Sequence, residues 1–154
     1  MTAHAKTVLP GTAVAVGGAD FPASAVLLRG FSGRGKSDLA FRLIGAGATL
    51  ICDDQVALER RQDDKIIAEP VESIRGLLEV RGLGLLKYPV APPTQLRLAV
   101  DLVSREDVPR LPDPETVDIL GVPVAVLKLH AFDASAPAKI IRAIELVHRP
   151  DLLV

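Results

Sequence analysis

The sequence has few aromatic residues and almost no net charge. Aromatic residues make up 3% of the 154 residues, and tryptophan is absent. Proteins that bind single-stranded nucleic acid stack its bases on aromatic side chains, so this class of function is not expected. The net charge of −1 provides no basic field that would attract nucleic acid or an anionic membrane surface.

The sequence also lacks the features of exported and membrane-spanning proteins. No apolar run approaches the length of about 18 residues that a membrane helix needs. Residues 1–6 are not followed by the long apolar run of a signal peptide. Cys52 has no second cysteine with which to form an internal disulfide bond, which is typical of the reducing cytosol. We therefore expect a cytoplasmic protein with no nucleic-acid or membrane partner.

What the chain does contain is enough apolar sequence for a folded core. Apolar residues account for 49% of the chain and charged residues for 24%. This length and composition predict one globular domain over residues 1–154. Residues 1–8, or as far as residue 10, are expected to form a loose arm.

One glycine-rich stretch matches the P-loop pattern G-x-x-x-x-G-K-[ST]. It consists of Gly30, Phe31, Ser32, Gly33, Arg34, Gly35, Lys36 and Ser37. An apolar strand over residues 25–29 precedes it, and a helix over residues 36–46 is expected to follow. Glycines let successive backbone N–H groups curl around phosphate oxygens, and the helix N-terminus faces the same anion. Lys36 can reach the β- and γ-phosphates of a nucleotide, and the Ser37 hydroxyl can bind Mg²⁺.

The other apolar stretches are short and predict a strand-rich chain. Strands are expected at residues 12–17, 25–29, 49–52, 56–60, 65–68, 95–103, 117–121 and 123–129. A second helix is expected to run to about residue 148, with Ser135 as its cap and Pro137 in its first turn. One early helix and one late helix among many strands indicate an α/β fold with a mixed sheet.

Two carboxylates, Asp53 and Asp54, follow the predicted strand over residues 49–52. Polar groups at the end of a buried strand, next after a P-loop helix, are well placed for metal or proton chemistry. The alternative is an exposed turn pair. Residues 76–87 are rich in glycine and apolar residues but include Glu79 and Arg81. These two side chains fit either a surface ion pair or a metal carboxylate and a phosphate-facing arginine.

Three segments together resemble the catalytic domain of HPr kinase/phosphorylase. They are residues 30–37, residues 50–54 and residues 76–84, of which the last closely matches the signature loop of that family. The resemblance covers about residues 12–129 and is closest to the short form of α-proteobacteria. It implies a P-loop fold related to phosphoenolpyruvate carboxykinase. It also implies a homo-oligomer, which is usual in this family. It also implies ATP- and Mg²⁺-dependent phosphorylation of a seryl residue on the phosphocarrier protein HPr, with a reverse dephosphorylation in many members.

The resemblance assigns roles to particular residues. Lys36 would hold the phosphates, and Ser37 and Glu79 would bind Mg²⁺. Asp54 would accept the proton of the seryl hydroxyl, although Asp53 stays open as the base. The remaining matches are Arg110, which aligns with a catalytic arginine, and the signature-loop residues Arg81 and Gly82.

Two alternative functions stay open, and two departures from the family pattern motivate the second of them. Pro10 stands about where the family has a histidine, and residues 130–136 contain no arginine where the longer enzymes have a basic segment. The alternatives are a P-loop kinase that acts on another substrate, and a nucleotide-binding regulatory module with weak or no catalysis. A nucleic-acid-binding ATPase is the least favoured hypothesis because charge is balanced and aromatic residues are few.

Overall fold

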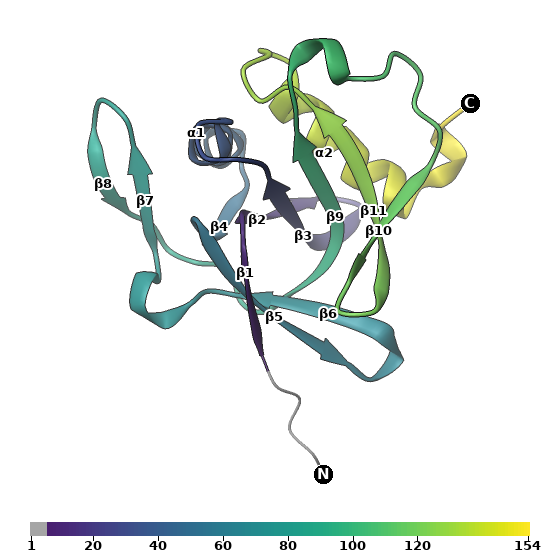
Figure 1. Cartoon of the computed structure of the whole chain (residues 1–154). Helices are drawn as coiled ribbons and strands as arrows, with labels where there is room; N and C mark the ends of the chain where they lie inside the picture. Colours follow the sequence, from purple (N-terminus) through teal and green to yellow (C-terminus); the bar gives the residue numbers. More distant parts are fainter. Residues whose placement is uncertain (1–5) are drawn as a thin grey trace.

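The computed structural model describes residues 6–154, which form a curled sheet with two helices and a separate hairpin (Figure 1). The strands are β1 (Thr7–Pro10), β2 (Thr12–Gly18), β3 (Phe21–Arg29), β4 (Thr49–Cys52), β5 (Gln55–Arg61), β6 (Lys65–Glu69), β7 (Leu77–Val80), β8 (Gly84–Lys87), β9 (Thr94–Leu102), β10 (Glu115–Ile119) and β11 (Val122–Leu129). The helices are α1 (Lys36–Gly45) and α2 (Ala136–His148). Short 3-10 turns are η1 (Gln62–Asp64), η2 (Glu72–Ile74), η3 (Arg105–Asp107) and η4 (Pro150–Leu152).

The main sheet mixes parallel and antiparallel pairs. Its strand order is β1-β5-β6-β9-β3-β2-β4, and β11 also pairs with β9 and carries β10 at its other edge. The pairs β3–β9 and β9–β11 are parallel, and the remaining pairs in the sheet are antiparallel. The expected α/β fold with a mixed sheet is therefore confirmed, as are its early and late helices.

Several loops meet at one edge of this sheet. Because β3, β9 and β11 are parallel, the segments that follow them begin at the same edge. Strand β2 is antiparallel to both β3 and β4, so β4 also ends at this edge and β2 begins there. The carboxyl ends of strands in an open α/β sheet are the usual place for a ligand. The P-loop follows β3 and the aspartate pair follows β4, so the topology brings these two motifs together.

The core lies on both faces of the sheet because side chains alternate along each strand. Val14, Val26 and Val100 face the buried sides of α1 and α2, which contribute Leu39, Leu43, Ile140 and Ile144. Ala13, Leu27 and Ala99 face the opposite way, toward a second cluster that includes Ile51, Leu58, Ile66 and Val124. Apolar residues from the strands themselves fill this second cluster, since the sheet curls over its own face (Figure 1).

Strands β7 and β8 form a two-stranded hairpin outside the main sheet. Leu78 and Val80 are buried in the same cluster as Leu39 and Leu43 of α1. The hairpin therefore stands beside α1, as Figure 1 shows at the far end from β10 and β11. Within residues 6–154, no helix has the length and apolarity needed to cross a membrane.

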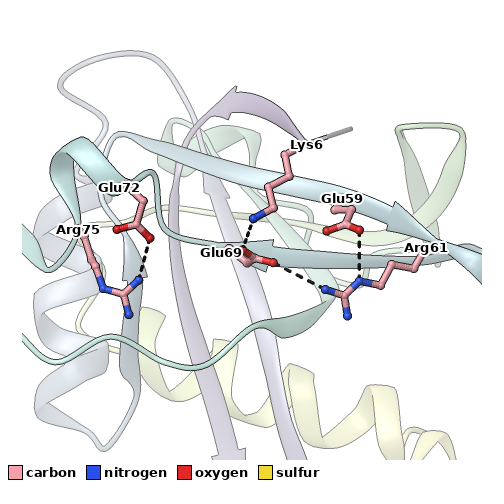
Figure 2. Close-up of polar contacts among 6 residues, drawn as sticks. All are labelled: Lys6, Glu59, Arg61, Glu69, Glu72 and Arg75. Atoms are coloured by element: carbon pink, nitrogen blue, oxygen red, sulfur yellow. Dashed lines mark hydrogen bonds and ion pairs between the residues drawn. The ribbon is translucent and has the colours of Figure 1, made fainter. Parts of the chain in front are cut away.

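The expectation of a loose N-terminal arm is wrong for residues 7–10, while residues 1–5 lie outside the described part. Residues 7–10 form β1, which pairs with β5 and covers the open hydrogen-bonding edge of that strand. Lys6 adds an ion pair at 2.7 Å to Glu69 of β6, which also lies 3.7 Å from Arg61 (Figure 2). Backbone pairing and charge therefore hold this segment against the β5–β6 hairpin.

The prediction for the start of the late helix is confirmed in position, but Ser135 does not cap the helix with its side chain. Ser135 does precede α2, and Pro137 lies in the first turn as expected. The side chain of Ser135, however, makes no capping hydrogen bond, and its backbone has helical φ and ψ angles of −83° and −2°. The helix is held by its packing instead, since Ala136, Ile140 and Ile144 recur every four residues on one buried face.

Candidate active site

The P-loop is shaped to bind an anion. Gly33 and Gly35 have φ angles of 84° and 86°, in the left-handed region that glycine adopts without steric cost. Gly35 occupies the N-cap position of α1, and no side chain caps this helix end. The first N–H groups of α1 are therefore available for phosphate oxygens. The Lys36 ammonium donates to the carbonyl oxygens of Gly30 at 2.6 Å and Phe31 at 3.2 Å, which holds the lysine across the loop.

The Ser37 hydroxyl connects the P-loop to the aspartate pair. It donates to Asp53 Oδ1 at 2.7 Å. The same oxygen accepts a second hydrogen bond, at 2.8 Å, from the hydroxyl of Thr12. Asp53 is 8% exposed, and a buried carboxylate is costly unless it is hydrogen-bonded. The two hydroxyl groups supply hydrogen bonds in place of water. These contacts join the start of α1, the start of β2 and the turn after β4 through side chains.

Asp54 differs from Asp53 in backbone conformation and in exposure. Its φ of 68° is in the left-handed region, where non-glycine residues are uncommon, and its side chain is exposed. Its carbonyl oxygen accepts from the Gly11 N–H at 3.0 Å, and its own N–H donates to Thr12 Oγ1 at 3.2 Å. The turn therefore buries one carboxylate beside Ser37 and presents the other to solvent.

The oxygens of Ser37 and Asp53 fit a magnesium site. Mg²⁺ prefers oxygen ligands, keeps several waters and is usually bound by one or two carboxylates together with substrate phosphates. Adjacent ligands in its octahedral shell lie about 2.9 Å apart, which is close to the 2.7 Å between Ser37 Oγ and Asp53 Oδ1. Among residues 6–154 no group of three histidine, cysteine or acidic side chains gathers as an all-protein cage. The donor set therefore suits a metal shared with nucleotide phosphates.

The loops after β9 and β11 add basic groups beside the P-loop. Arg34 donates to Ser104 Oγ at 3.0 Å, and Arg105 forms an ion pair with Asp133 at 2.8 Å. The hydrogen bond from Arg105 is the main reason that the pKa of Asp133 is lowered from its ordinary value. His130 lies on the same side, with Nδ1 3.0 Å from the carbonyl oxygen of Val103. These contacts tie together the segments that follow three parallel strands.

Cys52, which immediately precedes the aspartate pair, is a packing residue. It is buried, and burial raises the pKa of its thiol from the ordinary value of 9.0. Thiolates are the reactive form of cysteine, so a thiol with a raised pKa is a poor nucleophile. The chemistry of this turn therefore belongs to its carboxylates.

The structure does not bring every predicted residue to this cluster. Glu79 is exposed on β7, where its neighbours Leu78 and Val80 face α1 and its own side chain alternates to the opposite face. Arg81 and Gly82 lie in the exposed turn between β7 and β8. Arg110 is exposed in the segment between η3 and β10. Within residues 6–154, none of these side chains has a hydrogen bond to Ser37 or Asp53, and their roles stay predictions.

Sequence reasoning missed residues whose roles depend on distant contacts. Thr12 is the first, and its signal was present: it is the polar residue in the otherwise apolar run that begins β2. No motif marks Ser104 and Arg105, which follow β9, and Asp133 lies in the segment of residues 130–136, which contains no arginine. Arg105 supplies a guanidinium to that segment from another loop, which no local pattern reveals.

The fold and the site define a mixed α/β protein whose P-loop and aspartate pair share one sheet edge. A family model described as the HPr serine kinase C-terminal domain matches residues 5–152, and the chain belongs to this family. The family resemblance read from the three sequence segments is thus confirmed.

Individual relatives agree with this assignment. The chain is 42% identical over 111 residues to an HPr kinase/phosphorylase of Verminephrobacter eiseniae, and 40% identical over 114 residues to that of Cupriavidus metallidurans. These matches cover 64% and 68% of the chain but 35% of each relative, so the chain spans about a third of their length.

A solved structure has the same fold. The HPr(Ser) kinase/phosphatase from Coxiella burnetii superposes on this chain with a TM-score of 0.77. The superposition covers 95% of this chain and 92% of the Coxiella chain. The two sequences are 24% identical, so this likeness concerns the fold. It agrees with the mixed α/β architecture expected from the sequence.

Proposed function

We propose that this protein transfers the γ-phosphoryl group of ATP to a seryl hydroxyl of an HPr-type phosphocarrier protein. The observation that carries the proposal is the hydrogen bond between Ser37 of the P-loop and Asp53 of the aspartate pair. It places a phosphate-binding loop and two carboxylates in one site, which are the parts that phosphoryl transfer needs. The names of the relatives, HPr kinase/phosphorylase, support HPr as the acceptor. The single buried cysteine fits a location in the cytoplasm.

Phosphate binding falls to the P-loop and α1. The uncapped N–H groups at the start of α1 and the backbone of the loop would donate to the β- and γ-phosphate oxygens. Lys36 already lies across the loop, and it would exchange the carbonyl oxygens of Gly30 and Phe31 for phosphate oxygens. Magnesium, when bound, would be held by Ser37 and Asp53 and would neutralise charge on the phosphates.

Asp54 is the better candidate for the general base. Asp53 is buried and already engaged by two hydroxyl groups, whereas Asp54 is exposed to an approaching protein. In the transfer, the seryl oxygen forms a bond to the γ-phosphorus, and the bond from that phosphorus to the β–γ bridging oxygen breaks. The seryl proton passes to the Asp54 carboxylate, and ADP leaves. A seryl hydroxyl is a weak nucleophile at neutral pH, so a positioned carboxylate contributes about 10²- to 10⁴-fold.

The same carboxylate allows the reverse reaction. In phosphate-driven dephosphorylation, protonated Asp54 would return the proton to the seryl oxygen as inorganic phosphate takes the phosphoryl group to form pyrophosphate. The name of the relatives includes phosphorylase, which supports this second activity. Arg105, which forms an ion pair with Asp133, would contribute positive charge for the incoming phosphate.

The test is phosphorylation of the carrier followed by intact-mass analysis. The purified chain is incubated with ATP, Mg²⁺ and the HPr-type carrier of the same cell. We expect the carrier to gain the mass of one phosphoryl group, located on a serine by fragmentation, and to lose it when inorganic phosphate is added. Lys36→Ala is the control and should lose both ATP binding and transfer. Confirmed ATP binding without any gain in carrier mass would contradict the proposal and favour another substrate or a regulatory nucleotide-binding role.

A further inference from the structure

Thr12 lies between the two strands that lead into the site. It is the first residue of β2, where it is opposite Leu28 of β3, and the next residue, Ala13, is opposite Cys52 of β4. Its side chain is fully buried, at 0% exposure. A buried threonine at the start of a central strand therefore stands between the end of the P-loop strand and the end of the aspartate strand.

The Thr12 hydroxyl makes two hydrogen bonds to two consecutive aspartates. It donates to Asp53 Oδ1 at 2.8 Å and accepts from the Asp54 N–H at 3.2 Å. A hydroxyl has one donor and two acceptor lone pairs, so it can make both bonds at once. One side-chain oxygen thus fixes the carboxylate of Asp53 and the backbone of Asp54 at the same time.

Gly11, the residue before Thr12, has no room for a side chain. Gly11 has a φ of 140°, and a Cβ atom there would come within 2.9 Å of the Leu28 carbonyl oxygen. The Gly11 N–H donates to the Asp54 carbonyl oxygen at 3.0 Å. Residues 11 and 12 therefore hold the left-handed Asp54 residue through both its N–H and its carbonyl oxygen.

We propose that Thr12 is a positioning residue for phosphoryl transfer, which rests on the function proposed above. Its hydroxyl sets the rotamer of Asp53 against Ser37, and through the Asp54 N–H it sets the direction in which the exposed Asp54 carboxylate leaves the turn. Thr12 lies outside the P-loop and is buried, so it has no direct contact with nucleotide or acceptor. Its loss should therefore slow the chemical step and leave ATP binding almost unchanged.

The test compares Thr12→Val with Thr12→Ser and with a matched control. Valine keeps the branched shape and removes the hydroxyl, while serine keeps the hydroxyl. Thr94 provides the control because it is also a buried threonine that begins a strand, and its hydroxyl donates to the Pro92 carbonyl oxygen at 2.6 Å. We expect Thr12→Val to lower kcat roughly ten- to a hundredfold with the KM for ATP within about twofold. Thr12→Ser should keep most of the kcat, and Thr94→Val should keep all of it.

A purely structural role would give a different result. Equal kcat in Thr12→Val and wild type, or an equal loss in Thr12→Ser, would overturn the proposal. If wild type transfers nothing to the carrier, the proposed function fails. Amide hydrogen exchange then tests the contact between Thr12 and the Asp54 N–H without any need for activity. Protection of the Asp54 amide that is lost in Thr12→Val and kept in Thr12→Ser would support the positioning contact, and unchanged protection in Thr12→Val would overturn it.

Discussion

Arg29 and Asp101 form an ion pair with two parallel hydrogen bonds across β3 and β9. Arg29 Nε lies 2.7 Å from Oδ1 and Nη2 lies 3.0 Å from Oδ2, and the two residues are register partners. Each side chain is about one third exposed, at 33% and 31%. Arg29 immediately precedes Gly30, so this pair fixes the ends of two parallel strands at the point where the P-loop begins.

Asp101→Asn should lower the free energy of unfolding by about 1 kcal/mol. The reason is that the pair has two parallel hydrogen bonds and its side chains are only about one third exposed. The measurement is urea unfolding of the variant and wild type. Glu72→Gln is the matched control: Glu72 pairs with Arg75 at 3.1 Å but is 80% exposed (Figure 2). It should cost less than about 0.5 kcal/mol. Equal losses in the two variants would contradict a special role for the Arg29–Asp101 pair.

Gly35 should tolerate a methyl group less well than Gly33. Their φ angles are 86° and 84°, so alanine meets a similar backbone strain of about 1–2 kcal/mol at both positions. A Cβ atom at Gly35 would also lie 2.9 Å from the Phe132 ring and 3.1 Å from Ala131 Cβ, whereas one at Gly33 meets nothing within 4 Å. Gly35→Ala should therefore lose about 1 kcal/mol more stability than Gly33→Ala.

Thermal and urea unfolding of the two glycine variants provide the comparison. Phe132→Leu in the Gly35→Ala background should restore part of the loss, since it removes the ring atoms nearest to the added methyl group. An equal loss of stability at both positions, with no effect of Phe132→Leu, would mean that backbone strain alone matters.

His148 should make the stability depend on pH. Its ring stacks on Phe21 with centroids 5.1 Å apart, and Nε2 lies 2.8 Å from the Ser24 hydroxyl. Burial, with a smaller contribution from Arg97, lowers its pKa from the ordinary value of 6.5. The unfolded chain then binds more protons than the folded chain, so stability falls as the pH drops below 6.5 toward the folded-state pKa.

The measurement is the free energy of unfolding at pH values from about 7 down to 5, for wild type and His148→Gln. Glutamine has no titratable group, so we expect a shallower loss of stability over this range in the variant. Other groups titrate in both proteins and cancel in the comparison. Parallel curves for the two proteins would rule out this contribution from His148.

Local patterns predicted the parts of the site that local sequence determines. The P-loop glycines, Lys36 and the following helix depend on backbone conformation over a few residues, and the helix expected at residues 36–46 is observed as α1, Lys36–Gly45. The aspartate pair follows a buried strand as expected, and the sheet topology brings it beside the P-loop. Strands β3 and β4 end at the same edge because β2 runs antiparallel to both.

Local sequence patterns did not predict contacts between segments that are distant in the chain. Strand β1 is short, and only its pairing with β5 makes it a strand. The role of Thr12 depends on the position of β2 between β3 and β4, which the sequence around Thr12 does not indicate. The face of β7 that carries Glu79 is decided by the packing of Leu78 and Val80 against α1. Ser135 resembles a helix cap in sequence, but the turn that leads into α2 places it in a helical conformation.

Asp53 and Asp54 have different roles in the proposed transfer, and a measurement on one variant separates them. It is the rate of phosphoryl transfer from ATP to the HPr-type carrier by Asp54→Asn, with ATP affinity measured by calorimetry on the same preparation. Asparagine keeps the size of the side chain and cannot accept the seryl proton. We expect the transfer rate to fall about 10²- to 10⁴-fold while the affinity for ATP stays within about twofold of wild type. Transfer at the wild-type rate by Asp54→Asn would contradict the assignment of Asp54 as the base.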